Sequence, residues 1–230
     1  LHCLTNFSFQ RGASHPQELV ERAYRLGYAA LAITDECSVA GVVRAHVALR
    51  DLPEALAEDE AAHPERPPHP RNDDFALLMG SQFDFGRFTL VVLAHDLEGW
   101  GNLCEFITAA RMTAPKGQYR VRWEGGEGGE GGQGDEADSD MASLRHCEII
   151  FIPHRDPAGV FDVPAMQADL QRAAQLYGPH LWLAIELLHE LDDDLWFATL
   201  AELGMQTGVP LVASGDVHMH TRSRKPAPQG

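Results

Sequence analysis

The feature that most constrains the fold of this chain is an alternation of short apolar runs with segments of helical periodicity. The apolar runs have the length of strands and occupy residues 1–9, 29–34, 75–83, 88–94, 147–153, 181–188 and 210–214. Runs that are apolar throughout are typical of strands buried on both faces. Because strands that alternate with helices form a parallel sheet covered by helices, the sequence predicts an α/β protein, either an open doubly wound sheet or a barrel.

Helical segments separate most of these runs. The first is predicted to have Ser14 as its N-cap and Pro16 in its opening turn, and to end at Gly27. The others are expected near residues 38–50, 99–111, 164–177 and 192–207.

Length and composition favour one domain over residues 1–230, because a chain of 230 residues that is 44% apolar can bury one sizeable core. The sequence has no apolar stretch of membrane-spanning length and no basic-then-apolar leader, so we expect a cytoplasmic protein without a membrane partner. Its four cysteines are scattered without a CxxC pair, which favours reduced thiols.

The formal charge of −16 is unevenly placed. Residues 54–74 and 124–140 hold seven acidic residues each, and we interpret both stretches as acidic surface insertions. Prolines from 63 onward oppose regular structure in the first, and a glycine and acid repeat predicts disorder in the second. The rest of the chain is nearly neutral, so charge gives no direct evidence for contact with DNA.

Polar side chains follow the predicted strands. They are Asp35 and Glu36, Gln82 and Asp84, His95, His154, Glu186 and His189, and Asp216 and His218. In a barrel the carboxyl ends of the strands meet at one rim, where barrel enzymes place their sites. One basic cluster, Arg111, Lys116, Arg120 and Arg122, is either a solvated loop or a contact with nucleic acid or another part of the protein.

Three ordered blocks carry a resemblance to a known family: LHCLTNFSFQRGASHPQELVERAYRLGYAALAITDECSVAGVVRAH, LVVLAHDLEGWGNLCEFITAAR with KGQYR, and PLVASGDVHMHTRSRKP. Together they resemble the N-terminal PHP (polymerase and histidinol phosphatase) domain of bacterial C-family DNA polymerases, the polymerase III alpha family, in its error-prone, damage-inducible branch. The resemblance implies a distorted seven-stranded (βα) TIM-like barrel. It also implies an N-terminal fragment whose palm, fingers and thumb, with the catalytic aspartates and their Mg²⁺, lie outside this sequence.

PHP domains that bind metals resemble one another in a set of histidines and acids, and the resemblance implies that this set is degenerate here. His2 keeps the first imidazole, but Leu4 stands at the second position. Arg11 stands where many replicative relatives carry aspartate. In the next motif Asp35 matches and Glu36 replaces histidine.

Two further positions depart from the family pattern. Gln82 replaces glutamate, and Thr89 stands where the next histidine is expected, whereas Asp216 and His218 close the motif intact. We therefore expect a vestigial PHP site without a cofactor, formed by His2, Arg11, Asp35, Glu36, Gln82, Asp216 and His218. The alternative is a weak single-ion site for Zn²⁺ or Mn²⁺ on His2, Glu36, Asp216 and His218.

Loss of the metal has an electrostatic consequence. If Glu36 and Asp216 converge without a cation, two carboxylates are buried together, which is costly unless a positive group neutralises them or one of them takes a proton. We expect the guanidinium of Arg11 to be that group.

By resemblance, the parent is a DNA-directed DNA polymerase, a nucleotidyltransferase, that acts in damage-induced translesion synthesis, DNA repair and replication. This domain is expected to be a structural platform for the polymerase core of the same chain, inactive alone, with primer–template DNA and other translesion-synthesis proteins as partners of the parent. The alternatives are a metal-dependent phosphoesterase or proofreading 3′–5′ exonuclease that uses the PHP site, and a pure interaction module.

Overall fold

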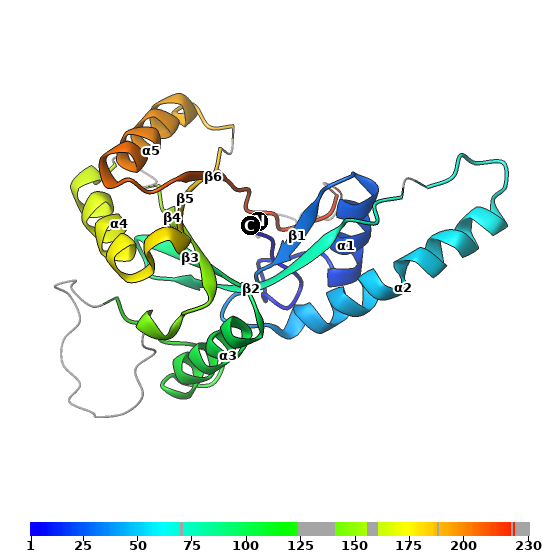
Figure 1. Ribbon diagram of the computed structural model, residues 1–230, viewed down its shortest axis with the longest axis horizontal. Coiled ribbons are helices and arrows are strands. Elements are labelled where there is room, and N and C mark those ends of the chain that lie inside the picture. Colours follow the sequence, from blue (N-terminus) through cyan, green and yellow to red (C-terminus); the bar gives the residue numbers. More distant parts are fainter. Residues whose placement is uncertain (70, 124–140, 156–160, 188, 222, 224–230) are drawn as a thin grey trace, which may run out of the picture. The chain divides into compact units, whose positions relative to one another are not determined.

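The computed structural model describes residues 1–69, 71–123, 141–155, 161–187, 189–221 and 223, which contain five α-helices and six β-strands (Figure 1). Contacts divide the chain into two compact units. Unit 1 comprises Leu1–Gly80 and Asp216–Gly230, and unit 2 comprises Ser81–Gly215. The predicted insertion at 124–140 lies outside the described residues, and the single domain over 1–230 stays a prediction.

Unit 1 pairs two strands and packs two helices together. Its elements are α1 (Pro16–Arg25), β1 (Ala30–Ile33), α2 (Ala40–Ala62) and the first half of β2 (Ala76–Asp84). β1 and β2 run parallel, with Ala30 opposite Ala76. α1 packs against α2 and buries Leu19, Val20 and Ala23, which lie on one face because residues three and four apart are neighbours on a helix.

Unit 2 contains the larger part of the sheet. Its elements after β2 are β3 (Phe88–Ala94), α3 (Leu97–Met112), β4 (Cys147–Pro153), α4 (Val163–Tyr177), β5 (Leu181–Ile185), α5 (Asp193–Thr207) and β6 (Leu211–Ala213), with short 3₁₀ turns at Met141–Ser143 and Gly178–His180. The strands from β2 to β6 lie in chain order. β3 and β4 are buried along almost their whole length and form the centre of the core.

The direction of β3 differs from the prediction of a parallel sheet. β4, β5 and β6 are parallel neighbours as predicted, but β3 is antiparallel to β4, with Phe88 opposite Pro153. The cause is a tight reversal before β3, where Phe85 N donates a hydrogen bond to Phe88 O (2.9 Å) and Gly86 adopts a φ of 82°. A connection this short reverses the strand direction, whereas a parallel pair requires a crossover.

The first apolar run also differs from the prediction. Within residues 1–9 of the described chain, Cys3 forms one isolated parallel bridge with Val217, and a turn follows at once, in which Ser8 N donates to Thr5 O (3.0 Å). This turn stops the run from extending as a strand. The described residues therefore hold six strands, and the expected seven-stranded barrel is not confirmed.

The helix expected at residues 38–50 is longer than predicted. α2 continues to Ala62 despite Pro53 inside it, and so includes the first part of the predicted insertion at 54–74. Leu52 and Leu56, four residues apart on one face, are buried and hold this extension against the rest of unit 1.

Among the helices that the structure describes, we find none that combines enough length with enough apolar character to cross a membrane.

Candidate functional site

The candidate site lies in unit 1, where the first residues of the chain pair with residues 216–218. Leu4 N donates a hydrogen bond to Val217 O (2.9 Å), and Val217 N donates one to His2 O (3.1 Å). This pairing brings together three of the predicted site residues, His2, Asp216 and His218, from the two ends of the sequence.

The carboxylate of Asp216 is the centre of this cluster. His218 Nε2 lies 2.7 Å from Asp216 Oδ1, and His2 Nε2 lies 3.7 Å from the same oxygen. Burial raises the pKa of Asp216, but the adjacent imidazole of His218 and the positive charges of His2 and Arg11 outweigh it and lower the pKa below its ordinary value. The cluster therefore favours an ionised carboxylate.

A second predicted site residue, Asp35, is committed to holding a loop. Its Oδ1 accepts hydrogen bonds from Thr5 N (2.8 Å) and Ser8 Oγ (2.7 Å), and its Oδ2 accepts one from Thr5 Oγ1 (2.8 Å). Asp35 is fully buried, and a Cβ at Gly41 would overlap its Oδ2. We call Thr5, Ser8 and Asp35 the Asp35 network. Its geometry directs the carboxylate toward the loop after Leu4 rather than toward a ligand.

Arg11 and Glu36 form the ion pair expected from the sequence. Arg11 Nη1 donates to Glu36 Oε2 at 2.9 Å, and both side chains are partly exposed. Glu36 N in turn donates to Ser8 Oγ (3.0 Å), which links the pair to the Asp35 network. Because the charge of Arg11 also lowers the pKa of Asp216, one guanidinium interacts with the carboxylates of both Glu36 and Asp216.

The residues that replace the expected ligands lie in both units. Leu4 is fully buried and offers no ligand atom. Gln82, in β2, and Thr89, in β3, belong to unit 2 and are described there alone. Gln82 is buried, and Thr89 Oγ1 lies 2.8 Å from His154 Nε2, the predicted rim histidine after β4.

The donor set does not fit the two or three metal ions implied by the family pattern. His2, Asp216 and His218 approach one another, yet no group of three or more histidine, cysteine, aspartate or glutamate side chains in the described part of the chain has the geometry of a metal site. Glu36, the fourth candidate, is paired with Arg11. A guanidinium at that distance would repel a divalent cation.

Sequence reasoning missed the role of Ser14 and His220. His220 N donates to Ser14 Oγ (2.9 Å), and the same hydroxyl lies 2.7 Å from His220 Nδ1. The predicted N-cap at Ser14 is wrong, because His15 occupies that position and its N–H donates to Glu18 Oε2 (2.9 Å). The sequence GDVHMH does indicate this pairing. Successive side chains of an extended chain point to opposite sides, so residues 218 and 220 lie on the same side.

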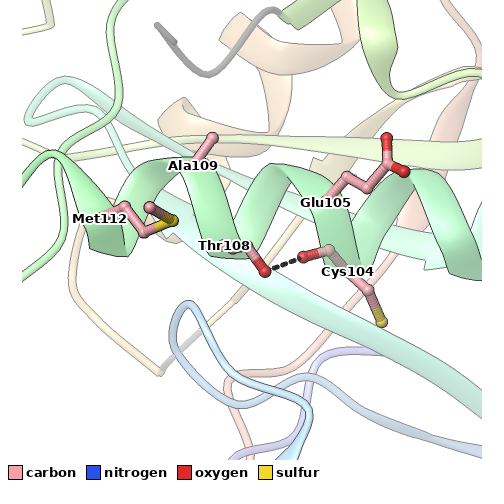
Figure 2. A pocket seen from close by; sticks show the side chains of 5 residues that line it. All are labelled: Cys104, Glu105, Thr108, Ala109 and Met112. Carbon is pink, nitrogen blue, oxygen red and sulfur yellow. Dashed lines mark hydrogen bonds between the residues drawn. The ribbon is translucent and has the colours of Figure 1, made fainter. Parts of the chain in front are cut away.

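Unit 2 also has a shallow hollow along α3 (Figure 2), which is lined by Cys104, Glu105, Thr108, Ala109 and Met112. Thr108 Oγ1 is bonded within the helix, to Cys104 O (2.8 Å). Of the five lining residues Glu105 alone carries a charge, so this hollow offers no cluster of groups suited to catalysis. In the predicted basic cluster, Lys116 and Arg120 are exposed.

Comparison with known proteins extends this description. The family model of the PHP domain matches residues 1–177. A protein named error-prone DNA polymerase from Azoarcus sp. (strain BH72) is 41% identical in an alignment 231 residues long, gaps included, that covers 98% of this chain and 20% of that protein. A protein of the same name from Ralstonia nicotianae is 41% identical in an alignment 235 residues long that covers 98% of this chain and 19% of that protein. This chain thus spans about a fifth of the length of the curated relatives.

A solved structure supports the fold. A protein from Bifidobacterium adolescentis, described as a metal-dependent phosphoesterase, superposes with a TM-score of 0.54 at 16% identity and covers 100% of this chain and 88% of its own. At this identity the likeness concerns the α/β fold and not the chemistry of the site.

Proposed function

The chain belongs to the PHP domain family, and from that premise we propose that it is the N-terminal domain of an error-prone DNA-directed DNA polymerase of the polymerase III alpha family. The support is 41% identity, over 98% of the chain, to proteins named error-prone DNA polymerase. In this proposal the parent acts in the cytoplasm in translesion synthesis, DNA repair and replication, and its Mg²⁺-binding aspartates lie in the four-fifths of the protein outside these residues.

Within that parent, the domain serves as a structural platform with a degenerate metal site. The observation that carries this role is the Arg11–Glu36 ion pair at 2.9 Å. A guanidinium beside a candidate ligand supplies the positive charge that a divalent ion would supply, without the ion. The buried Leu4 and the commitment of Asp35 to its network agree with the same role.

Metal content tests the degenerate site. The 230-residue chain is treated with a chelator, reloaded with Zn²⁺ or Mn²⁺, desalted and measured by mass spectrometry of the metal. We expect far less than one equivalent per chain. A full equivalent that is lost in Asp216→Asn but kept in the exposed control Asp73→Asn would contradict the proposal.

Primer extension tests the parent activity. The full-length protein is expected to extend a primer past a template lesion, and the 230-residue chain alone is expected to be inactive. A full-length protein without nucleotidyl transfer would contradict the polymerase assignment.

One observation favours a second candidate, a metal-dependent phosphoesterase or a proofreading 3′–5′ exonuclease. Two imidazoles and one carboxylate, from His2, His218 and Asp216, lie close together, although the described residues form no group of three with the geometry of a metal site. Imidazole and carboxylate are ligands for a water-activating divalent ion. Hydrolysis of a phosphate ester that requires added Mn²⁺ and is lost in Asp216→Asn would favour this enzyme over the platform.

A further inference from the structure

A cavity of about 330 Å³ lies in unit 2, between the turn before β4 and the end of α4. Its volume is within the range of pockets that bind small molecules. The wall combines apolar side chains with three basic residues, and none of the described residues that line it is acidic. The basic residues are Arg145, His146 and His180, and the apolar wall includes Leu144, Leu176 and Tyr177.

A carboxylate lies beside the Nδ1 atom of each of the two histidines. His180 Nδ1 lies 2.9 Å from Glu148 Oε1, and His146 Nδ1 lies 2.9 Å from Asp96 Oδ2. Neither carboxylate lines the cavity. His146 Nε2 lies 3.7 Å from Glu98 Oε1, whereas His180 Nε2 has no hydrogen-bond partner among the described residues. The two carboxylates therefore orient the imidazoles and leave His180 Nε2 available to a ligand.

The backbone around His146 is also held in place. Its φ is 57°, in the left-handed region that residues other than glycine adopt uncommonly. Its carbonyl oxygen accepts a hydrogen bond from His95 N (2.9 Å), and a Cβ at Gly99 would overlap the same oxygen. Such a conformation persists only where the surroundings impose it, and it is frequent at ligand sites. The position of this imidazole is therefore set before any ligand arrives.

The other polar groups of the wall are not free to react. The thiol of Cys147 donates to Gly99 O (3.5 Å), and burial raises its pKa to about 12, so it stays protonated. The hydroxyl of Tyr177 donates to Met141 O (3.2 Å). Arg145, by contrast, is exposed and forms no ion pair with another described residue. The cavity thus offers cationic hydrogen-bond donors without an activated nucleophile, which suits binding rather than covalent catalysis.

We propose that this cavity binds a small phosphate monoester with an apolar or aromatic body, held by Arg145, His146 and His180. A phosphate monoester presents three terminal oxygens and up to two negative charges, which match one guanidinium and two imidazoles. A carboxylate has two oxygens and one charge, and so matches this group of donors less well. The apolar body would lie against Leu144 and Leu176.

The proposal goes beyond the polymerase assignment and does not depend on it, because every residue involved lies in unit 2 of this chain. It also differs from nucleic-acid binding. One small anion needs only this local group of cations, whereas a phosphate backbone needs an extended basic surface.

Chemical modification of His180 in the full-length protein tests the proposal. Diethyl pyrocarbonate reacts with neutral imidazoles, and mass spectrometry of the peptides distinguishes His180 from the other histidines. The probe is phenyl phosphate, and the exposed His46, on α2, is the internal reference. Phenyl phosphate at about 10 mM should slow the modification of His180 about tenfold, which corresponds to a dissociation constant of about 1 mM, and should leave His46 unchanged. No protection of His180 would overturn the proposal.

A matched pair of variants tests the role of the guanidinium. In Arg145→Gln the protection should fall below about twofold. Arg120→Gln, which removes another exposed arginine of unit 2, should keep it. The rate of His180 modification without the probe should be the same in both variants and in the wild type, which reports that the cavity is intact. Protection that survives unchanged in Arg145→Gln would contradict the proposal.

Two further probes test the chemical class of the ligand. Phenol has the ring without the phosphate, and benzoate has a carboxylate in its place, so both should protect His180 at least about fivefold less than phenyl phosphate does at the same concentration. Equal protection by phenol would assign the cavity to apolar ligands, and equal protection by benzoate to carboxylates, and either result rejects a phosphate site. Primer extension by the same samples reports on the proposed function alone, so the two proposals can fail separately.

Discussion

At the scale of single residues, three acidic side chains of unit 1 have three different roles that depend on the atoms around them. Asp35 is fully buried and accepts hydrogen bonds from a backbone amide and two hydroxyls. Glu36, its neighbour in sequence, pairs with a guanidinium. Asp216 lies beside two imidazoles, and its pKa is lowered although burial opposes this. Of these three carboxylates, only that of Asp216 lies beside imidazoles, which are side chains that can bind metals.

Replacing Asp35 tests the network at this scale. Asp35→Ala removes the acceptor for Thr5 N and Ser8 Oγ in a buried place, so we expect the free energy of unfolding to fall by about 3 kcal/mol. The measurement is urea denaturation, with the exposed Asp73→Ala as the control. A change equal to that of the control would show that the network does not stabilise the loop.

At the scale of the elements, the start of α3 is stabilised by a pair of oppositely charged side chains. Asp96 is its N-cap and accepts a hydrogen bond from Gly99 N (2.9 Å). That bond, with the contact of His146, lowers the pKa of Asp96, and the hydrogen bond to Asp96 raises the pKa of His146. His146 Nδ1 lies 2.9 Å from Asp96 Oδ2. The start of α3 and the turn before β4 therefore share one charge pair.

The two pKa shifts predict a pH window. The contribution of Asp96, whose pKa is lowered on folding, is complete above its unfolded pKa of about 4 and is lost as pH falls through the folded value. The contribution of His146, whose pKa is raised, is complete below its unfolded pKa of about 6.5 and is lost as pH rises through the folded value. Both contributions to stability are therefore present between about pH 4 and about pH 6.5.

His146→Gln tests this window. We expect the variant to lower the melting temperature more at about pH 5.5 than at about pH 9, because only the lower pH keeps the imidazole charged. His46→Gln, on the exposed side of α2, is the control variant. A His146→Gln effect that is constant between the two pH values would count against the charge pair.

A second prediction at this scale concerns Pro53 inside α2. Proline lacks the N–H that a helix interior uses, so Pro53→Ala should raise the free energy of unfolding by about 1 kcal/mol or more. Denaturant unfolding measures this, with Pro64→Ala, beyond the helix, as the control. A loss of stability in Pro53→Ala would mean that the proline serves a packing role at this point.

At the scale of the whole molecule, charge and composition bear on what the chain contacts. Of its 34 acidic residues, fourteen lie in two stretches, and the nearly neutral remainder of the chain has no excess of the basic residues that bind phosphate. The proposed role as a platform needs no contact with DNA, whereas the alternative exonuclease does. Direct binding therefore separates these functions.

The 230-residue chain is expected not to retard a labelled primer–template duplex at about 0.15 M salt. Electrophoretic mobility shift measures this, with the full-length protein as the positive control. Binding tighter than about 10 μM that weakens with salt would contradict the prediction. Its loss in Lys116→Glu and Arg120→Glu would then locate the contact.

The sequence by itself determined the features that depend on local periodicity and on residue type. The helices expected at 164–177 and 192–207 are found at Val163–Tyr177 and Asp193–Thr207, because an apolar face at helical spacing is a local property. The family, and the pairing of Arg11 with Glu36, also followed from residue identity. Tertiary structure alone decided the antiparallel direction of β3, the turn that ends the first run, and the commitment of Asp35 to Thr5 and Ser8. These depend on atoms that are distant in the sequence, and a carboxylate has the same one-letter code whether hydroxyls, a guanidinium or imidazoles surround it.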